Sequence, residues 1–254
     1  MRLKPFLLAA LLVPATVMAQ DKDIQNSVNH PEKENFLKVN ITSLPLKNYQ
    51  VQFERVLSKK VSAALGVRVM PTTGIPLKSL VLDAVGDDQD TRDLVENSRL
   101  SNFAITPELR FYLGKGYGKG FYIAPYYRYT KFSTDNITLT YSASNGPERT
   151  VSLNGEMSGH TGGIMFGAQW FLGRSICLDW WIVGAHYGAG NGSFSGTPNV
   201  PFTPSEQDEV REILEDIDVP LIEKNISVTA NSIAAKIDGP FGGLRAGILL
   251  GFRF

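Results

Sequence analysis

The side chains best suited to chemistry in this sequence are nine charged residues inside otherwise apolar segments. They are Lys38, Glu54, Arg68, Glu108, Arg110, Arg128, Asp179, Arg245 and Arg253. Each shares its parity with polar or small neighbours, so all nine are expected on one side of their β-strands. Six bases and three acids on that side allow two uses. They can form salt bridges that fill a narrow interior, or they can line a passage that favours anions.

Two other stretches look like binding motifs, but each lacks a part that its chemistry needs. The glycine-rich segment 114–120 (GKGYGKG) has no following Ser or Thr and lies in an expected hairpin, which argues against a phosphate loop. The acidic run 87–90 (DDQD) lacks the glycine and the terminal Glu of a calcium loop. The single cysteine, Cys177, cannot form an internal disulfide. We therefore expect no metal and no cofactor.

The segments that hold the charged residues alternate between apolar and polar side chains, most clearly at 244–254 (LRAGILLGFRF). Apolar residues of one parity are Leu244, Ala246, Ile248, Leu250, Phe252 and Phe254. Arg245 and Arg253 lie on the other parity. Period-2 alternation predicts a β-strand with one apolar face, and a soluble core would not accept two unpaired arginines. A strand of about ten residues between lipid and a polar lumen is the unit of a transmembrane β-barrel.

Eight segments alternate in this way, and they predict an all-β fold, an eight-stranded antiparallel transmembrane up-and-down β-barrel. They lie at 37–42, 49–54, 61–69, 103–113, 121–129, 163–172, 176–182 and 244–254. An even strand number returns the chain to the side where it began. The periplasmic turns are then short, at 58–60, 114–120 and 173–175. The extracellular connections are long, at 71–101, 133–160 and 189–239. A ten-stranded alternative splits 225–237 from the last strand.

Two of the long connections contain helical patterns, so we expect partly helical extracellular loops. Residues 203–217 open with Thr203-Pro204-Ser205-Glu206, a capping box with proline at the first helical position. Residues 76–97 show a weaker pattern. Both segments are acidic.

The N-terminus predicts export and divides the chain into three parts. Arg2 and Lys4 precede an apolar run at 6–13, and Val17-Met18-Ala19 forms a small-residue cleavage site. Residues 1–19 are therefore expected to be a signal peptide, 20–34 a flexible periplasmic lead-in and 35–254 the outer-membrane barrel domain. The chain has 25 basic and 25 acidic residues. Without a basic surplus we expect no nucleic-acid partner.

Four stretches resemble the small outer-membrane β-barrels of Gram-negative bacteria, of the OmpA-type size. They are NFLKVNITSLPLKNYQVQFERVL (35–57), ELRFYLGKGYGKGFYIAPYYRY (108–129), LDWWIVGAHYG (178–188) and LRAGILLGFRF (244–254). More closely, the chain resembles a bacterial outer-membrane barrel family of unassigned function. The resemblance implies insertion into outer-membrane lipid by the barrel-assembly machinery, with Leu250, Phe252 and Phe254 as the assembly signal. It brings no catalytic residues.

The histidines do not form a hydrolytic site in the sequence. Outer-membrane hydrolases need a nucleophile beside a base. Lipid A deacylases resemble one another in a His-x-Ser pair, whereas His186 precedes Tyr187-Gly188 and His160 precedes Thr161-Gly162. No spacing pairs either histidine with an acid, as in outer-membrane proteases. We therefore expect that the protein is not an enzyme.

These observations predict an outer-membrane barrel with a plugged polar lumen and a structural or interaction role. A protein or surface ligand would bind its extracellular loops. The alternative is a narrow porin-like channel, and a lipid- or peptide-hydrolysing enzyme is the third hypothesis.

Overall fold

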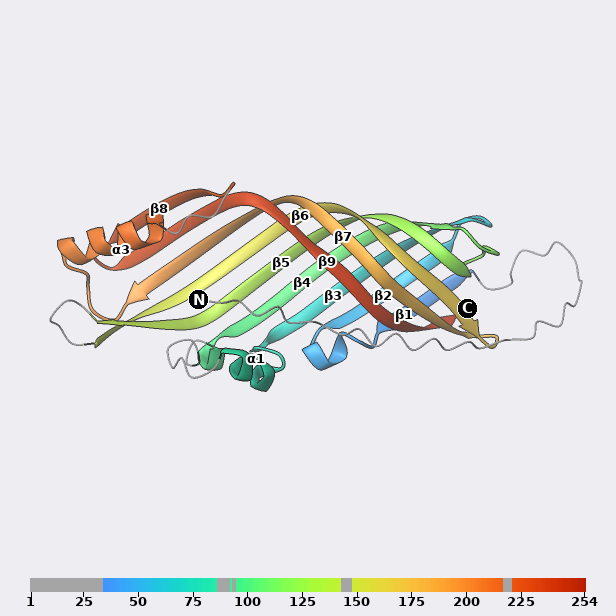
Figure 1. The fold of residues 1–254 in the computed structure, drawn as a ribbon, viewed down its shortest axis with the longest axis horizontal. Coiled ribbons are helices and arrows are strands. Elements are labelled where there is room, and N and C mark those ends of the chain that lie inside the picture. The colour runs from blue at the N-terminus through green and yellow to red at the C-terminus, as the bar shows by residue number, and fades with distance from the viewer. Residues whose placement is uncertain (1–33, 86–91, 93–94, 143–147, 217–220) are drawn as a thin grey trace, which may run out of the picture. The chain divides into compact units, whose positions relative to one another are not determined.

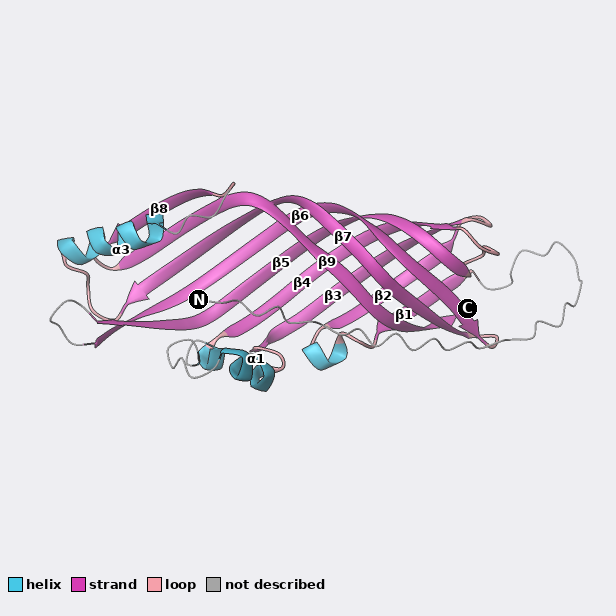
Figure 2. Ribbon diagram, in the orientation of Figure 1, coloured by secondary structure: helices cyan, strands magenta, loops and turns pink. Residues whose placement is uncertain are grey.

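The computed structural model of the chain (Figure 1) describes residues 34–85, 92, 95–142, 148–216 and 221–254. The chain divides into two units, Met1–His30 and Pro31–Phe254, and all of the described residues belong to the second. The predicted signal peptide and nearly all of the predicted lead-in lie outside the described residues, as does the acidic run at 87–90. Most of what is described is strand, with a few short helices (Figure 2).

The described residues form nine antiparallel strands in one sheet, and the sheet closes on itself in a ring. The strands are β1 (Asn35–Asn40), β2 (Tyr49–Val56), β3 (Val61–Gly74), β4 (Arg99–Tyr112), β5 (Gly120–Ser142), β6 (Glu148–Leu172), β7 (Ile176–Pro198), β8 (Glu223–Thr229) and β9 (Ser232–Arg253). Their order is β1-β2-β3-β4-β5-β6-β7-β9-β8, and β1 also pairs with β9. The prediction of an all-β, antiparallel, up-and-down sheet is confirmed.

The predicted number of eight strands is wrong, because a ninth strand lies beside the ring. Among the described residues, eight strands close the ring at the β1–β9 seam, where Lys38 lies opposite Gly251. The ninth, β8, pairs only with β9 and forms a tight hairpin with it. Its turn is closed by the Ser232 amide, which donates to Thr229 Oγ1 at 3.1 Å. The ten-stranded alternative is also wrong, since Ser232–Arg253 is one continuous strand.

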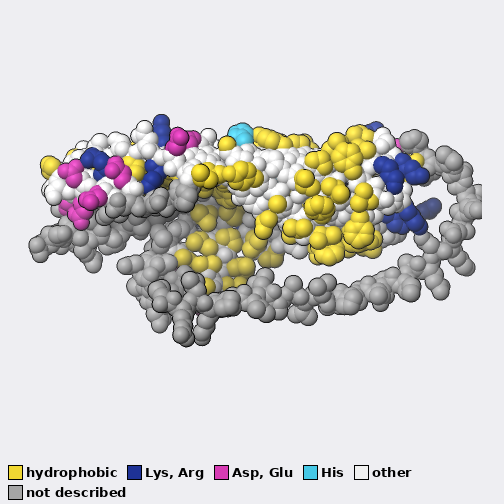
Figure 3. Space-filling model, turned by 45° about the horizontal axis from the view of Figure 1, so that its top comes forward, with side chains coloured by type: hydrophobic (Ala, Val, Ile, Leu, Met, Phe, Trp, Pro, Cys, Tyr) yellow, Lys and Arg dark blue, Asp and Glu magenta, His cyan; other side chains and the backbone are white. Residues whose placement is uncertain are grey.

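Side chains alternate across the ring strands as the sequence predicts. On β1, Leu37 is 48% exposed whereas the neighbouring Lys38 is fully buried. The same holds on β2, where Phe53 is 42% exposed and Glu54 is fully buried. Figure 3 shows hydrophobic side chains gathered over the ring strands, with basic side chains grouped at the end that carries the short turns. The ring therefore has an apolar exterior and a polar interior.

Four strands run far beyond the ring and form sheet where long loops were predicted. β5, β6, β7 and β9 have 23, 25, 23 and 22 residues, compared with 6 in β1 and 8 in β2. The predicted loop at 133–160 is therefore wrong wherever the structure describes it, and the predicted loop at 189–239 is wrong for about half of its length. These stretches are rich in Gly, Ser, Thr and Asn, and their apolar residues alternate only over short runs, as at Ile137, Leu139 and Tyr141. They are strands nonetheless because their backbone groups pair with the neighbouring strands.

Helices and turns lie mostly where the sequence predicts them. The helix α3 (Pro204–Asp216) begins with the predicted capping box, in which the Thr203 amide donates to Glu206 Oε2 at 2.8 Å. It covers a small core around Val151, Phe202 and Val228. The helix α1 (Lys78–Val85) and the short helix η1 (Leu44–Leu46) lie in two connections. The three predicted short turns are confirmed. No described helix has the length and apolar character needed to cross a membrane.

Candidate functional site

The centre of the ring interior holds a network of four buried charged side chains. Lys38 Nζ donates to Glu54 Oε2 and, at 2.7 Å, to Asp179 Oδ2. Arg110 Nη1 donates to the same two carboxylates, at 3.0 Å to Glu54 and 2.7 Å to Asp179. All four side chains have an exposed fraction of 0%. Each base therefore contacts both acids, and each acid contacts both bases.

The ring brings these four residues together from strands that are far apart in the sequence. They come from β1, β2, β4 and β7, and each is the inward-facing residue of its alternating segment. Small inward residues leave the space they occupy. A side chain at Gly251, opposite Lys38, would place its Cβ within 2.5 Å of Lys38 Cγ. The glycine is required there because the lysine stem crosses over it.

A second layer extends the network toward the loop end of the ring. Arg110 Nη2 also donates to Glu108 Oε2 at 3.0 Å, and Arg245 Nη2 donates to Glu108 Oε1 at 2.9 Å. The Arg245 guanidinium lies 4.6 Å from the Tyr126 ring centre and 4.5 Å from that of Trp181. The complete network is named here the charge network, and its charged members are Lys38, Glu54, Glu108, Arg110, Asp179 and Arg245. Three bases meet three acids, so its formal charge is zero.

Neutral side chains complete the hydrogen bonding of the buried carboxylates. Tyr112 Oη donates to Glu54 Oε1 at 2.6 Å, and Tyr122 Oη donates to Asp179 Oδ1 at 2.7 Å. Gln169 accepts from Lys38 at 2.5 Å, and Gln52 accepts from Arg110 at 2.8 Å. We did not single out these residues in the sequence, although their inward parity was visible. Buried charges are stable only when their remaining donors and acceptors are also satisfied, which is what these neutral groups do.

The turn end of the interior is filled by apolar and aromatic side chains. Phe36 and Cys177 are fully buried there, with Phe171 packed against them. Arg253 belongs to this region rather than to the charge network, since its guanidinium lies 4.5 Å from the Phe171 ring centre. Of the nine residues singled out in the sequence, six thus lie in the charge network. Arg253 lies between the network and the turn end of the ring.

The remaining two, Arg68 and Arg128, lie on the loop side of the charge network. Neither forms an ion pair with any carboxylate that the structure describes. Arg128 Nη1 donates to Thr106 Oγ1 at 3.0 Å. The charges of the interior are therefore divided between a balanced region and a basic region.

His186 also faces the ring interior, although continuing the alternation of residues 176–182 along the strand would turn it outward. A β-bulge between Trp181 and Gly184 shifts the register of β7, so the parity of the following residues is reversed. His186 Nδ1 lies 3.1 Å from Tyr126 Oη, and its ring lies beside Gly243. The bulge adds one residue to β7, and this single residue turns His186 from the outer to the inner face. The sequence pattern does not predict the bulge.

The two histidines of the described residues contact tyrosine hydroxyl groups. His160 contacts Tyr127 Oη at 2.5 Å and His186 contacts Tyr126, so neither histidine bonds a described serine or carboxylate. No group of three or more His, Cys, Asp or Glu residues that could hold a metal lies within the described part of the chain.

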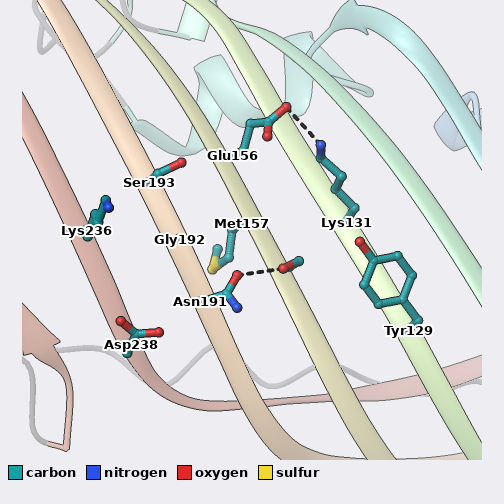
Figure 4. A pocket seen from close by; sticks show the side chains of 10 residues that line it. Tyr129, Lys131, Glu156, Met157, Asn191, Gly192, Ser193, Lys236 and Asp238 are labelled. Atoms are coloured by element: carbon teal, nitrogen blue, oxygen red, sulfur yellow. Dashed lines mark hydrogen bonds and ion pairs between the residues drawn. The ribbon is translucent and has the colours of Figure 1, made fainter.

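A shallow polar hollow of about 360 Å³ lies on the outer surface of β5, β6, β7 and β9 (Figure 4). Lys131 pairs with Glu156 across it at 3.0 Å, and Ser158 Oγ donates to Asn191 Oδ1 at 2.7 Å. Lys236 and Asp238 lie on its β9 side. Both lysines have an acid nearby, so this hollow carries no excess charge that would favour a charged ligand.

Comparison with known proteins assigns the chain to a family. A family model described as "Protein of unknown function (DUF3575)" matches residues 15–192. The chain belongs to this family. The matched range includes every charged member of the charge network except Arg245, and it leaves α3, β8 and β9 outside. Comparison with curated proteins and comparison with solved structures each gave no match.

Proposed function

We propose that the protein is an outer-membrane β-barrel of a Gram-negative bacterium, with a plugged lumen and a structural or interaction role. The observation that carries this proposal is the contrast between the two faces of the closed ring. Its exterior is apolar and exposed, and its interior holds a fully buried network of charges. A soluble protein rarely exposes so large a continuous apolar surface, whereas lipid is the natural solvent for it.

The height of the apolar surface fits a bilayer. Outward apolar residues run from Val61 to Val69 on β3 and from Leu244 to Phe252 on β9. Each run matches the about 9–11 residues that a tilted strand needs to cross the hydrocarbon core. The short turns then lie on the periplasmic side, and the long strands with α3 project from the cell, as in other outer-membrane barrels.

The charge network supports a plug rather than a channel. A ring of eight strands is only just wide enough for side chains to fill its interior. Here Lys38, Arg110 and the carboxylates between them cross that interior without solvent exposure. Ions would have to displace paired charges to pass. We therefore place the narrow porin-like channel second, and we propose no catalytic role.

The projecting part of the sheet supports a role in interaction. The core around Phe202 fixes α3 against β8, so the helix is held in one orientation. Its exposed carboxylates include Asp208, Glu209, Glu212 and Glu215. We propose that this acidic helix presents a binding surface to a protein or surface ligand outside the cell.

Labelling of single cysteines in intact cells of a Gram-negative host tests location and orientation together. Ser205→Cys lies on exposed α3, and Ser58→Cys is its matched control in a short turn. The native Cys177 is buried and stays silent. A membrane-impermeant maleimide should label Ser205→Cys in intact cells and Ser58→Cys only after lysis. Labelling at both sites in intact cells, or recovery of the protein in a soluble fraction, would refute the proposal.

Deletion of Phe254 tests the proposed assembly signal at Leu250, Phe252 and Phe254. All three side chains lie on the exposed face of the last strand, where the assembly machinery could bind them. The deletion should lower the outer-membrane yield, whereas Phe254→Tyr should keep it. Equal outer-membrane yields of the parent, the Phe254 deletion and Phe254→Tyr would contradict the assembly role.

A further inference from the structure

A cavity lies inside the ring, on the loop side of the charge network. Its volume is about 200 Å³, several times the ~30 Å³ that a water molecule occupies in the liquid. Arg68, Arg128 and Arg245 line it, together with Thr130, His186 and Phe241. We name it the arginine cavity. Arg245 belongs both to the charge network and to this lining, so the network borders the cavity on its turn side.

Several polar atoms of the arginine cavity have no partner among the described residues. Arg128 is 3% exposed and Arg245 is 7% exposed, so both are almost completely removed from water. Three buried atoms of its lining have no hydrogen-bond partner among the described residues: Arg68 Nε, Arg245 Nη1 and Thr130 Oγ1. An unpaired buried donor costs free energy, so these atoms call for a partner such as water or a bound ion.

The charge of the arginine cavity selects the ligand class. Arg245 is balanced by Glu108, but Arg68 and Arg128 form no ion pair with a described carboxylate. The described carboxylates therefore leave these two positive charges without a direct partner. A phosphate group carries about −1.5 to −2 charges near neutral pH. Its oxygens also match the planar donor fork of a guanidinium, which binds phosphate in bidentate fashion.

We propose that the arginine cavity binds a phosphate group that enters from the loop end of the ring. Arg68, Arg128 and Arg245 hold its oxygens, and Thr130 Oγ1 supplies a further donor. The phosphate belongs either to a free phosphate ion or to a phosphorylated lipid headgroup at the rim. Both have the same anchoring chemistry, and the experiment separates them.

Calorimetric titration of the full chain purified in a zwitterionic detergent tests the proposal. The measurement does not depend on where the protein lies in the cell, so it can fail while the proposed location holds. One arm uses inorganic phosphate against chloride at equal ionic strength. The other uses mixed micelles that contain lipid A with its phosphates, against dephosphorylated lipid A. Saturable binding in the phosphate-containing sample of either arm supports the proposal and identifies the source. Binding in neither arm overturns it.

Variants show whether the arginines are responsible. Arg68→Gln and Arg128→Gln should each weaken phosphate binding at least tenfold. Lys131→Gln removes a positive charge from the outer surface instead and should change binding less than twofold. Equal weakening in Lys131→Gln, or unchanged binding in both arginine variants, would overturn the proposal. If a glutamine variant does not fold, Arg128→Lys keeps the charge but loses the fork, and it should bind several-fold more weakly. Unchanged affinity in that variant would count against phosphate recognition by the fork.

Discussion

Two neighbouring regions of one interior use arginine in opposite ways. In the charge network, Arg110 bonds three carboxylates and one glutamine, and the charges add up to zero. In the arginine cavity, Arg68 and Arg128 lie near another arginine and form no ion pair with a described acid. The first arrangement stabilises the fold, because each buried charge has a partner. The second holds positive charges that pair with no described carboxylate, and a bound anion would neutralise them.

The largest expected effect comes from removing an acid of the charge network. Asp179→Asn takes one partner from both Lys38 and Arg110 and leaves their charges buried. Loss of one partner of a buried pair typically costs about 3–5 kcal/mol. We expect a loss of this order in the unfolding free energy, measured by urea titration in detergent. The exposed Asp238→Asn is the control and should change it by less than about 0.5 kcal/mol. Equal effects of the two substitutions would show that the network does not stabilise the ring.

Glu108 joins the two regions, so its substitution should affect them in opposite directions. Glu108→Gln removes the acid that Arg110 and Arg245 share. Hydrogen bonds to charged groups contribute about 1.5–3 kcal/mol, and we expect a loss of unfolding free energy in that range. Arg245 also becomes free to attract an anion, so phosphate should bind several-fold more tightly. Weaker phosphate binding in this variant would contradict the division into two regions.

Arg68→Gln tests the sign of the effect in the arginine cavity. The substitution removes a charge from a site with three arginines and no described ion pair at Arg68. Without phosphate, the variant should be more stable than the parent by about 0.5–1 kcal/mol, a gain typical of a relieved unfavourable site. Urea titration in phosphate-free buffer measures it. A loss comparable to that of Asp179→Asn would mean that Arg68 is part of the stabilising network.

The smallest expected signal is conductance. The purified protein in planar bilayers should give no stable single-channel steps, because the charge network fills the ring. Steps that disappear in Arg128→Ala or Arg245→Ala would refute the plug and favour the porin-like channel. A well-characterised porin inserted under the same conditions controls for bilayer quality.

Alternation along the strands predicted nine inward charged residues, but it did not show that Arg68, Arg128 and Arg253 lie outside the charge network. Lys38, Glu54 and Asp179 could be assigned to the interior from parity alone. Their height along the ring depends on the stagger between strands, which is set by pairing registers that no single strand encodes. The sequence therefore could not show that Arg110 belongs to the charge network whereas Arg128 lies on its loop side.

Two other features could not be predicted, for different physical reasons. The bulge after Trp181 turns His186 inward, and it arises from the fit between β7 and its neighbours rather than from any residue type. The extensions of β5 and β6 carry many Ser, Thr, Asn and Gly residues, and their apolar runs are short, as at Val151 and Leu153. Their backbone groups pair with the neighbouring strands, and this pairing cannot be predicted from the amino-acid composition of one segment.

The burial of the charge network depends on the pairing of β1 with β9. Lys38 belongs to the first strand, and the backbone that covers it at Gly251 belongs to the last. Until β9 pairs with β1, the Lys38 ammonium therefore stays hydrated. A chain truncated within β9 keeps Lys38, Glu54, Glu108, Arg110 and Asp179. It loses part of the β1–β9 seam that covers Lys38. Lys38 is therefore buried only after β1 and β9 have paired.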